Sequence, residues 1–147
     1  MGLFDKLKQC FSKEVPEPVA SWSHPSFGEF VWNAEAEAWV GAYGACGMSF
    51  GFENASEPNA ECVDFAIRLF SDQTLFNSSL IQAKSEAKAS MASHLGDEIE
   101  SLSVQAIHFC LCPEGEALVV EFAGGQHGRE WTADFVGLDC QGLSYGG

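Results

Sequence analysis

The chain has 147 residues, of which 7 are Lys or Arg and 21 are Asp or Glu, so its formal net charge is −14. A chain of this length forms one domain that buries ~70% of its unfolded surface, and its 12 Phe and 4 Trp residues exclude an intrinsically disordered chain. The composition also argues against nucleic-acid binding, because contacts with phosphates need clustered cations that are scarce here.

The charge is unevenly distributed along the chain. Residues 1–13 hold three lysines against Asp5, a net +2, whereas residues 14–147 hold four cations against twenty acids, a net −16. An acidic body repels anionic lipid and nucleic acid and speeds the encounter with a basic partner. The alternative is that the charge only keeps the protein in solution.

The cysteines and the N-terminus indicate a reducing compartment. Six cysteines occur, at positions 10, 46, 62, 110, 112 and 140. The N-terminus has an acid at position 5 and no apolar run of a secretory signal, so we expect a cytoplasmic protein with reduced thiols. No apolar run approaches the ~18 residues of a membrane helix, so we expect no membrane span.

The first 26 residues differ in pattern from the rest. Apolar residues fall at helical spacing in residues 2–11, which predicts a short amphipathic helix that is marginal by itself in water. Residues 12–26 contain three of the five prolines and are typical of an extended linker.

Strand and helix patterns then alternate in blocks. Period-2 alternation, or a high content of aromatic and β-branched residues, predicts strands over residues 27–32, 39–43, 48–52, 104–112, 118–122 and 131–135, with 143–145 as a further edge. Helical spacing of apolar residues predicts helices over residues 59–71 and 73–95. Asn59 is the expected N-cap of the first helix, and Gly96 is expected just past the end of the second.

These elements predict an α+β fold. We expect a single antiparallel sheet of about six strands in the order βββ-αα-βββ, with two helices packed on one face. The organisation is an amphipathic segment and linker over residues 1–26, followed by one α+β domain over residues 27–147.

One strand carries a possible metal site. His108, Cys110 and Cys112 project from the same face of a predicted strand, and thiolates with an imidazole suit a soft or borderline metal. Adjacent same-face positions of a strand lie about 6–7 Å apart, wider than the turn-type spacing of structural zinc sites. The alternative is a central strand with small side chains on one face, and we assign no cofactor.

Nucleophilic catalysis has weak support in the sequence. Ser49 and Ser144 each lie at the centre of a Gly-x-Ser-x-Gly match, but neither sits between a strand and a helix as a nucleophile elbow requires. Reactive cysteines need an electropositive setting, which an acidic chain does not favour. We therefore assign no catalytic residue and expect a protein that is not an enzyme.

Trp32 and Trp39 flank the first predicted turn. Exposed tryptophans at such a position would anchor a protein partner. The alternative is that both rings close the end of the core.

A motif near the start of the domain resembles a known pattern. The run His24-Pro25-Ser26-Phe27-Gly28-Glu29-Phe30, followed by Trp39-Val40-Gly41, resembles the opening of small bacterial domain-of-unknown-function families, some of which are immunity-protein-like. The resemblance covers the layout of the chain but only about ten residues in motif, and these are structural in type, so it transfers no catalytic residue. The middle strands depart from the pattern in being rich in Gly and Cys.

The sequence therefore favours a cytoplasmic bacterial protein that acts by protein binding, as an immunity-like acidic binder of a basic partner. A metal-binding protein that uses the His-x-Cys-x-Cys strand is one alternative. A small thiol-dependent or hydrolytic enzyme is the other.

Overall fold

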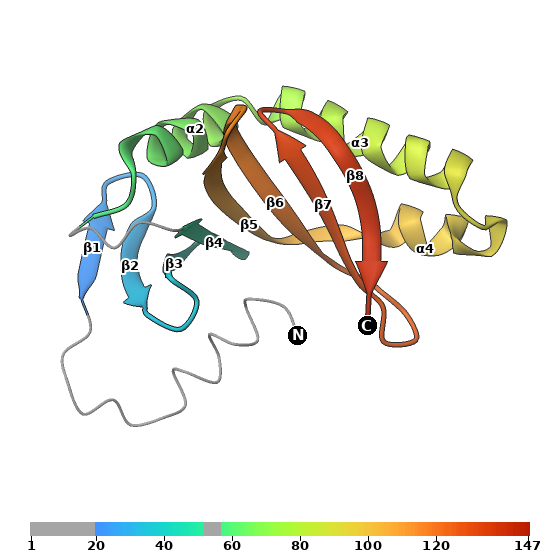
Figure 1. The fold of residues 1–147 in the computed structure, drawn as a ribbon, viewed down its shortest axis with the longest axis horizontal. Coiled ribbons are helices and arrows are strands. Elements are labelled where there is room, and N and C mark those ends of the chain that lie inside the picture. The colour runs from blue at the N-terminus through green and yellow to red at the C-terminus, as the bar shows by residue number, and fades with distance from the viewer. Residues whose placement is uncertain (1–19, 52–56) are drawn as a thin grey trace.

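The computed structural model describes residues 20–51 and 57–147, which form one curled sheet with helices on one of its faces (Figure 1). The strands are β1 (Ser21–His24), β2 (Gly28–Asn33), β3 (Ala38–Tyr43), β4 (Cys46–Gly51), β5 (Ser103–Cys112), β6 (Gly115–Ala123), β7 (Glu130–Val136) and β8 (Asp139–Gly146). The helices are α2 (Ala60–Ser71), α3 (Gln73–Ser90), the short 3-10 turn η1 (Ser93–Leu95) and α4 (Gly96–Ser101). The helix expected over residues 2–11 lies outside the described residues.

The strand order in the sheet follows the chain from β1 to β8. All neighbouring strands are antiparallel except β4 and β5, which run parallel with Phe50 opposite Phe109. The helices lie in the connection between these two strands, and a parallel pair needs such a long crossover because the chain must return to the end at which it started.

The predicted fold class is wrong in three respects. The sheet has eight strands and not six, it is mixed and not antiparallel, and three α-helices occupy the crossover where two were expected. Residues 21–24, assigned to the linker, form β1, and the predicted edge at 143–145 is the full strand β8. Pairing of β4 with β5 depends on contacts between distant segments, which the local alternation of residues does not report.

The helix boundaries are partly as predicted. Asn59 caps α2, and its side-chain oxygen accepts hydrogen bonds from the backbone N–H groups of Glu61 and Cys62. The second helix ends at Ser90 and not at residue 95, and Gly96 begins α4 in right-handed helical conformation. The turn after Ser90 places Leu95 in the core.

Alternation along the strands gives the sheet two different faces. On the inner face, under the helices, Phe109 of β5 is 0% exposed and contacts the rings of Phe50, Phe65 and Phe70. Full burial of such a ring stabilises the fold by about 1.5–3 kcal/mol. The outer face carries the residues that alternate with these. Among them are Ser49, His108 and the residue of β6 that lies opposite His108.

The motif residues near the start of the domain have structural roles. His24 and Gly28 bound the β1–β2 turn, in which the His24 carbonyl accepts a hydrogen bond from the Phe27 N–H at 3.2 Å and Gly28 adopts a φ of +80°. At Gly41, a Cβ atom would lie 2.8 Å from the ring of Phe30, so glycine is what lets this ring lie over β3.

Candidate functional site

β5 carries the three residues of the predicted metal site. His108, Cys110 and Cys112 lie at alternate positions of the strand and are all half-buried. The Cys112 thiol donates a hydrogen bond to the carboxylate of Glu114, and this hydrogen bond lowers the pKa of that carboxyl below its ordinary value. Within residues 20–51 and 57–147, no three His, Cys, Asp or Glu side chains are grouped closely enough to hold a metal ion.

His108 is held in a polar chain that crosses three strands. Its Nδ1 lies 2.6 Å from Ser49 Oγ on β4, and its Nε2 lies 3.0 Å from Glu121 Oε2 on β6. An ionised carboxylate only accepts hydrogen bonds, so Nε2 donates to Glu121, and Nδ1 of a neutral ring accepts from the Ser49 hydroxyl. Both ring nitrogens are therefore engaged by Ser49 and Glu121 in this structure.

The order serine, histidine, acid is also that of a hydrolytic relay, which transfers a proton away from the serine. Ser49, however, is only 2% exposed and lies in mid-strand, where the backbone of β4 pairs with β3 on one side and β5 on the other. A relay needs an accessible nucleophile and donors aimed at an oxyanion. Ser49 lacks the first, and its strand's backbone groups serve the two ladders, so this chain of contacts ties β4, β5 and β6 together.

Sequence reasoning missed this arrangement. In the sequence, Ser49 stands out as the centre of a Gly-x-Ser-x-Gly match, and no local pattern distinguishes Glu121. Alternation alone places Ser49 on the outer face of its strand, but the register that sets it opposite His108 comes from the unpredicted parallel pair.

Three of the five cysteines that the structure describes have pKa values shifted away from those of catalytic thiols. Burial is the main cause that raises the pKa values of Cys46, Cys110 and Cys140 above the ordinary thiol value. A nucleophilic cysteine needs the opposite shift, because the thiolate is the reactive form.

The two tryptophans proposed as partner anchors pack against each other. Trp32 and Trp39 meet edge to face with their ring centroids 5.6 Å apart. Trp39 is 1% exposed, so its ring belongs to the core, and among the described residues its Nε1 has no hydrogen-bond partner. Trp32 is half-buried and packs against the core cluster.

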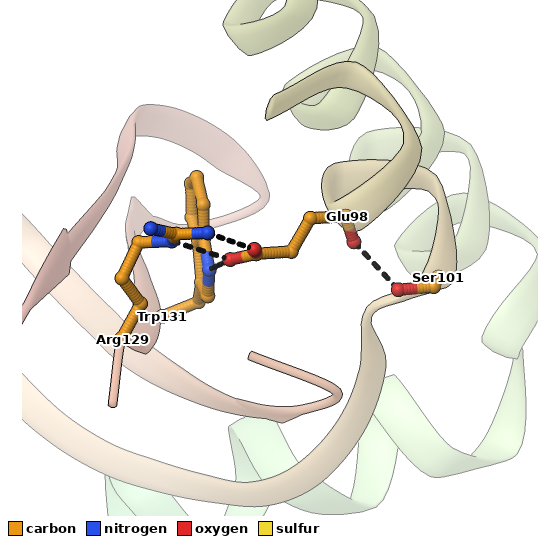
Figure 2. A network of polar contacts seen from close by, with 4 residues as sticks. All are labelled: Glu98, Ser101, Arg129 and Trp131. Atoms are coloured by element: carbon orange, nitrogen blue, oxygen red, sulfur yellow. Dashed lines mark hydrogen bonds and ion pairs between the residues drawn. The ribbon is translucent and has the colours of Figure 1, made fainter. Parts of the chain in front are cut away.

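A buried carboxylate joins α4 to the start of β7 (Figure 2). Glu98 accepts hydrogen bonds from Arg129, whose Nε lies 2.9 Å from Oε2, and from the indole N–H of Trp131. The Ser101 hydroxyl donates to the Glu98 carbonyl at 2.8 Å. The hydrogen bond from Arg129 is the main cause that lowers the pKa of Glu98 to about 2, so the pair is charged and holds the fold.

All four Lys and Arg side chains that the structure describes are bonded within the chain. Arg68 pairs with Glu116, Lys88 with Glu100 and Arg129 with Glu98, while Lys84 Nζ donates to the Leu102 carbonyl at 2.6 Å. The same residues include seventeen Asp and Glu, most of them exposed. The outward surface of this part of the chain is therefore strongly acidic.

Three of these carboxylates surround one open hollow on the outer face. We call it the acidic hollow and define it by Glu114, after β5, Asp134 of β7 and Asp139 of β8. Its volume is about 520 Å³, and its remaining lining is Cys112, Ala117, Leu118, Val119, Phe135, Val136 and Gln141. The acidic hollow combines negative charge at its rim with apolar side chains on its floor.

No helix in the described part of the chain is long and apolar enough to cross a membrane. No family model, curated protein or solved structure matches the chain.

Proposed function

We propose that the protein acts by binding and that its acidic hollow receives a cationic segment of a partner protein. The observation that carries this proposal is the clustering of Glu114, Asp134 and Asp139 around an open hollow, in a body whose four described cations are bonded internally. Among the described residues that line the hollow, none is basic, so none of them neutralises these carboxylates.

A lysine or arginine side chain matches both parts of the hollow. Its aliphatic stem can cover apolar floor residues such as Ala117 and Val136, while its charged end meets the carboxylates. An exposed ion pair contributes only about 0.2–1 kcal/mol, so recognition would need several pairs at once and would weaken with salt.

The resemblance to immunity-like proteins supports the same direction. The acidic surface of an immunity-like protein would be complementary to a basic surface on its partner. Such complementary charge raises the association rate and suppresses wrong partners. A reducing cytoplasm is the compartment that suits thiols such as Cys46 and Cys110. Burial of Ser49 and the raised pKa values of the Cys46 and Cys110 thiols favour binding over a hydrolytic or thiol-dependent activity.

The test is a titration of the protein with a lysine-rich peptide at low and high salt, in which calorimetry or fluorescence anisotropy measures the binding. The triple variant Glu114→Gln, Asp134→Asn, Asp139→Asn removes three charges without changing side-chain size. We expect it to lose about tenfold or more in affinity at low salt, if each pair contributes at the upper end of the exposed range.

A matched control removes the same charge elsewhere. Glu29→Gln, Asp64→Asn, Asp97→Asn alters three exposed carboxylates on β2, α2 and α4. We expect its affinity to fall much less than that of the hollow variant. Equal losses in the two triple variants would mean that net charge alone attracts the peptide, and the hollow would not be the site.

A further inference from the structure

β8 is the last strand of the sheet, with β7 on one side and no further strand on the other among the described residues. It has eight residues, contains no proline or lysine, and is exposed along most of its length, with Leu143 its one buried residue. Natural edge strands usually carry proline or lysine, which prevent another chain from pairing with them. A register shift near Asp134 interrupts the ladder there and α3 packs against β8, whereas the register from Gly142 to Gly146 is regular.

The opposite edge of the sheet is protected. β1 has only four residues, and Pro25 follows it directly. Proline cannot donate to a ladder and limits the length of strand that can pair. The two edges therefore differ, and β8 offers the longer template for an added strand.

The register between β7 and β8 connects this edge with the acidic hollow. Asp134 is paired with Gly142, which has no side chain, and a Cβ placed on Gly142 would meet nothing within 4 Å. The space over Gly142 beside Asp134 is therefore open. A residue opposite Gly142 on an added strand would lie two strand spacings, about 10 Å, from Asp134, a gap that an extended lysine and an aspartate span together.

Charge selects the occupant of this edge. Asp139 begins β8, and it also lines a second, smaller hollow with Glu86 of α3. A second copy of this chain would bring a net charge of −14 toward these carboxylates. An extended basic segment would bring the complementary charge.

The geometry points to β8 as the docking edge for an extended basic segment of the partner. That segment adds a ninth strand to the sheet, and Asp134 selects a lysine or arginine opposite Gly142. The inference rests on the proposed function and adds to it the mode of binding and the residue that reads the partner's charge.

The experiment compares two peptides of identical charge with the full chain. The first alternates Lys with Thr, which favours an extended strand, and the second carries N-methyl groups on alternate backbone nitrogens, which prevents it from pairing with an edge. The readouts are affinity at low salt and hydrogen exchange of the β8 amides. We expect the first peptide to slow exchange of alternate amides in Gly142–Gly146 and the second to bind about tenfold more weakly, without protection.

A variant pair tests the role of the glycine. Gly142→Thr fills the open space beside Asp134, and we expect it to weaken binding of the first peptide about five- to tenfold. Gly51→Thr on β4 is the matched control, because a Cβ there also meets nothing within 4 Å, and it should leave the affinity unchanged.

The outcomes separate the two proposals. Equal binding of both peptides without β8 protection would overturn the docking edge and leave the acidic hollow as a binding site. Failure of both peptides to bind at low salt would overturn the proposed function and the docking edge together. If the β8 amides of the peptide-free protein become protected from exchange as the protein concentration rises, the edge binds a second copy and the inference is overturned. If Gly142→Thr binds the first peptide with unchanged affinity, the role of Asp134 is overturned.

Discussion

Two carboxylates near the same strand, Glu98 and Asp134, lie in opposite surroundings on the two faces of the sheet. At the start of β7, Glu98 is buried with Arg129 and Trp131, and its charge is satisfied within the chain. Three residues along the same strand from Trp131, Asp134 points to the outer face and borders the acidic hollow, whose described lining contains no cation. The same kind of group therefore stabilises the fold in one place, and in the other it borders the hollow at which we propose that a partner binds.

The difference lies in what surrounds each group. A buried charge is tolerated only when it is paired and hydrogen-bonded, and Arg129 supplies both conditions for Glu98. An exposed carboxylate keeps its hydration and costs little to leave without a cation. Substitution of Glu98 should therefore change mainly the stability, and substitution of Asp134 should change mainly the binding.

The largest expected effect is on the inner face, at Phe109. Phe109→Ala removes a ring that contacts Phe50, Phe65 and Phe70, and we expect the free energy of unfolding to fall by about 3–5 kcal/mol. Urea denaturation followed by circular dichroism measures this loss. Leu111→Ala on the same strand is the control, since Leu111 is 37% exposed, and a loss as large there would show that burial does not distinguish the two sites.

The second effect tests the buried carboxylate. Glu98→Gln leaves Arg129 without its charged partner, and we expect the Tm at neutral pH to fall on the order of 10 °C. Asp97→Asn removes the neighbouring exposed carboxylate and should change the Tm by much less. A similar Tm for the two variants would contradict the stabilising role of the Glu98 network.

The pH dependence of Glu98 follows from its pKa. The pKa of about 2 lies below the ordinary 4.5, so the native state holds the charged form more strongly than the unfolded state does. The stabilisation is present above pH 4.5 and is lost as the pH falls from 4.5 toward 2. The difference in Tm between the wild-type protein and Glu98→Gln should therefore narrow over that range, and a constant difference would count against the low pKa.

A smaller effect is expected in the polar chain on the outer face. Ser49→Ala removes the hydroxyl that bonds His108 Nδ1, and we expect the free energy of unfolding to fall by about 1 kcal/mol. Ser144→Ala removes the exposed serine of the other Gly-x-Ser-x-Gly match, and we expect the free energy of unfolding to change by less than about 0.5 kcal/mol. Ester hydrolysis by the wild-type protein that disappears in Ser49→Ala would show a catalytic role instead.

The smallest effect on stability is expected at the acidic hollow. Asp134→Asn alters an exposed side chain, so the free energy of unfolding should change by less than about 0.5 kcal/mol. The same variant should bind a lysine-rich peptide more weakly at low salt. A large loss of stability would place Asp134 with Glu98 among the groups that hold the fold, and the contrast between the two faces would fail.

Several features could be predicted from the sequence because they depend on near neighbours. The alternation of Met48 and Phe50 with Ser49 predicts a strand, and the structure has β4 there. Asn59 is an N-cap because its side chain reaches backbone groups only two and three residues ahead. The acidic character of the body also follows from counting residues.

The sites depend on contacts between distant parts of the chain. Ser49 and His108 are 59 residues apart and meet only because β4 and β5 pair in parallel. Asp134 and Gly142 become neighbours through the register of β7 and β8. Spacing along the strand predicts that His108 acts together with Cys110 and Cys112. In the structure, the two nitrogens of its ring instead form hydrogen bonds with Ser49 and Glu121 on the neighbouring strands.

By itself, the sequence determined the local elements and the sign of the surface charge, since each depends on composition or on residues a few positions apart. Only the tertiary structure decided which strands pair, which carboxylates meet an internal cation and which remain around a hollow. The physical reason is that strand pairing is fixed by the joint packing of distant segments, whose free energies no local pattern contains.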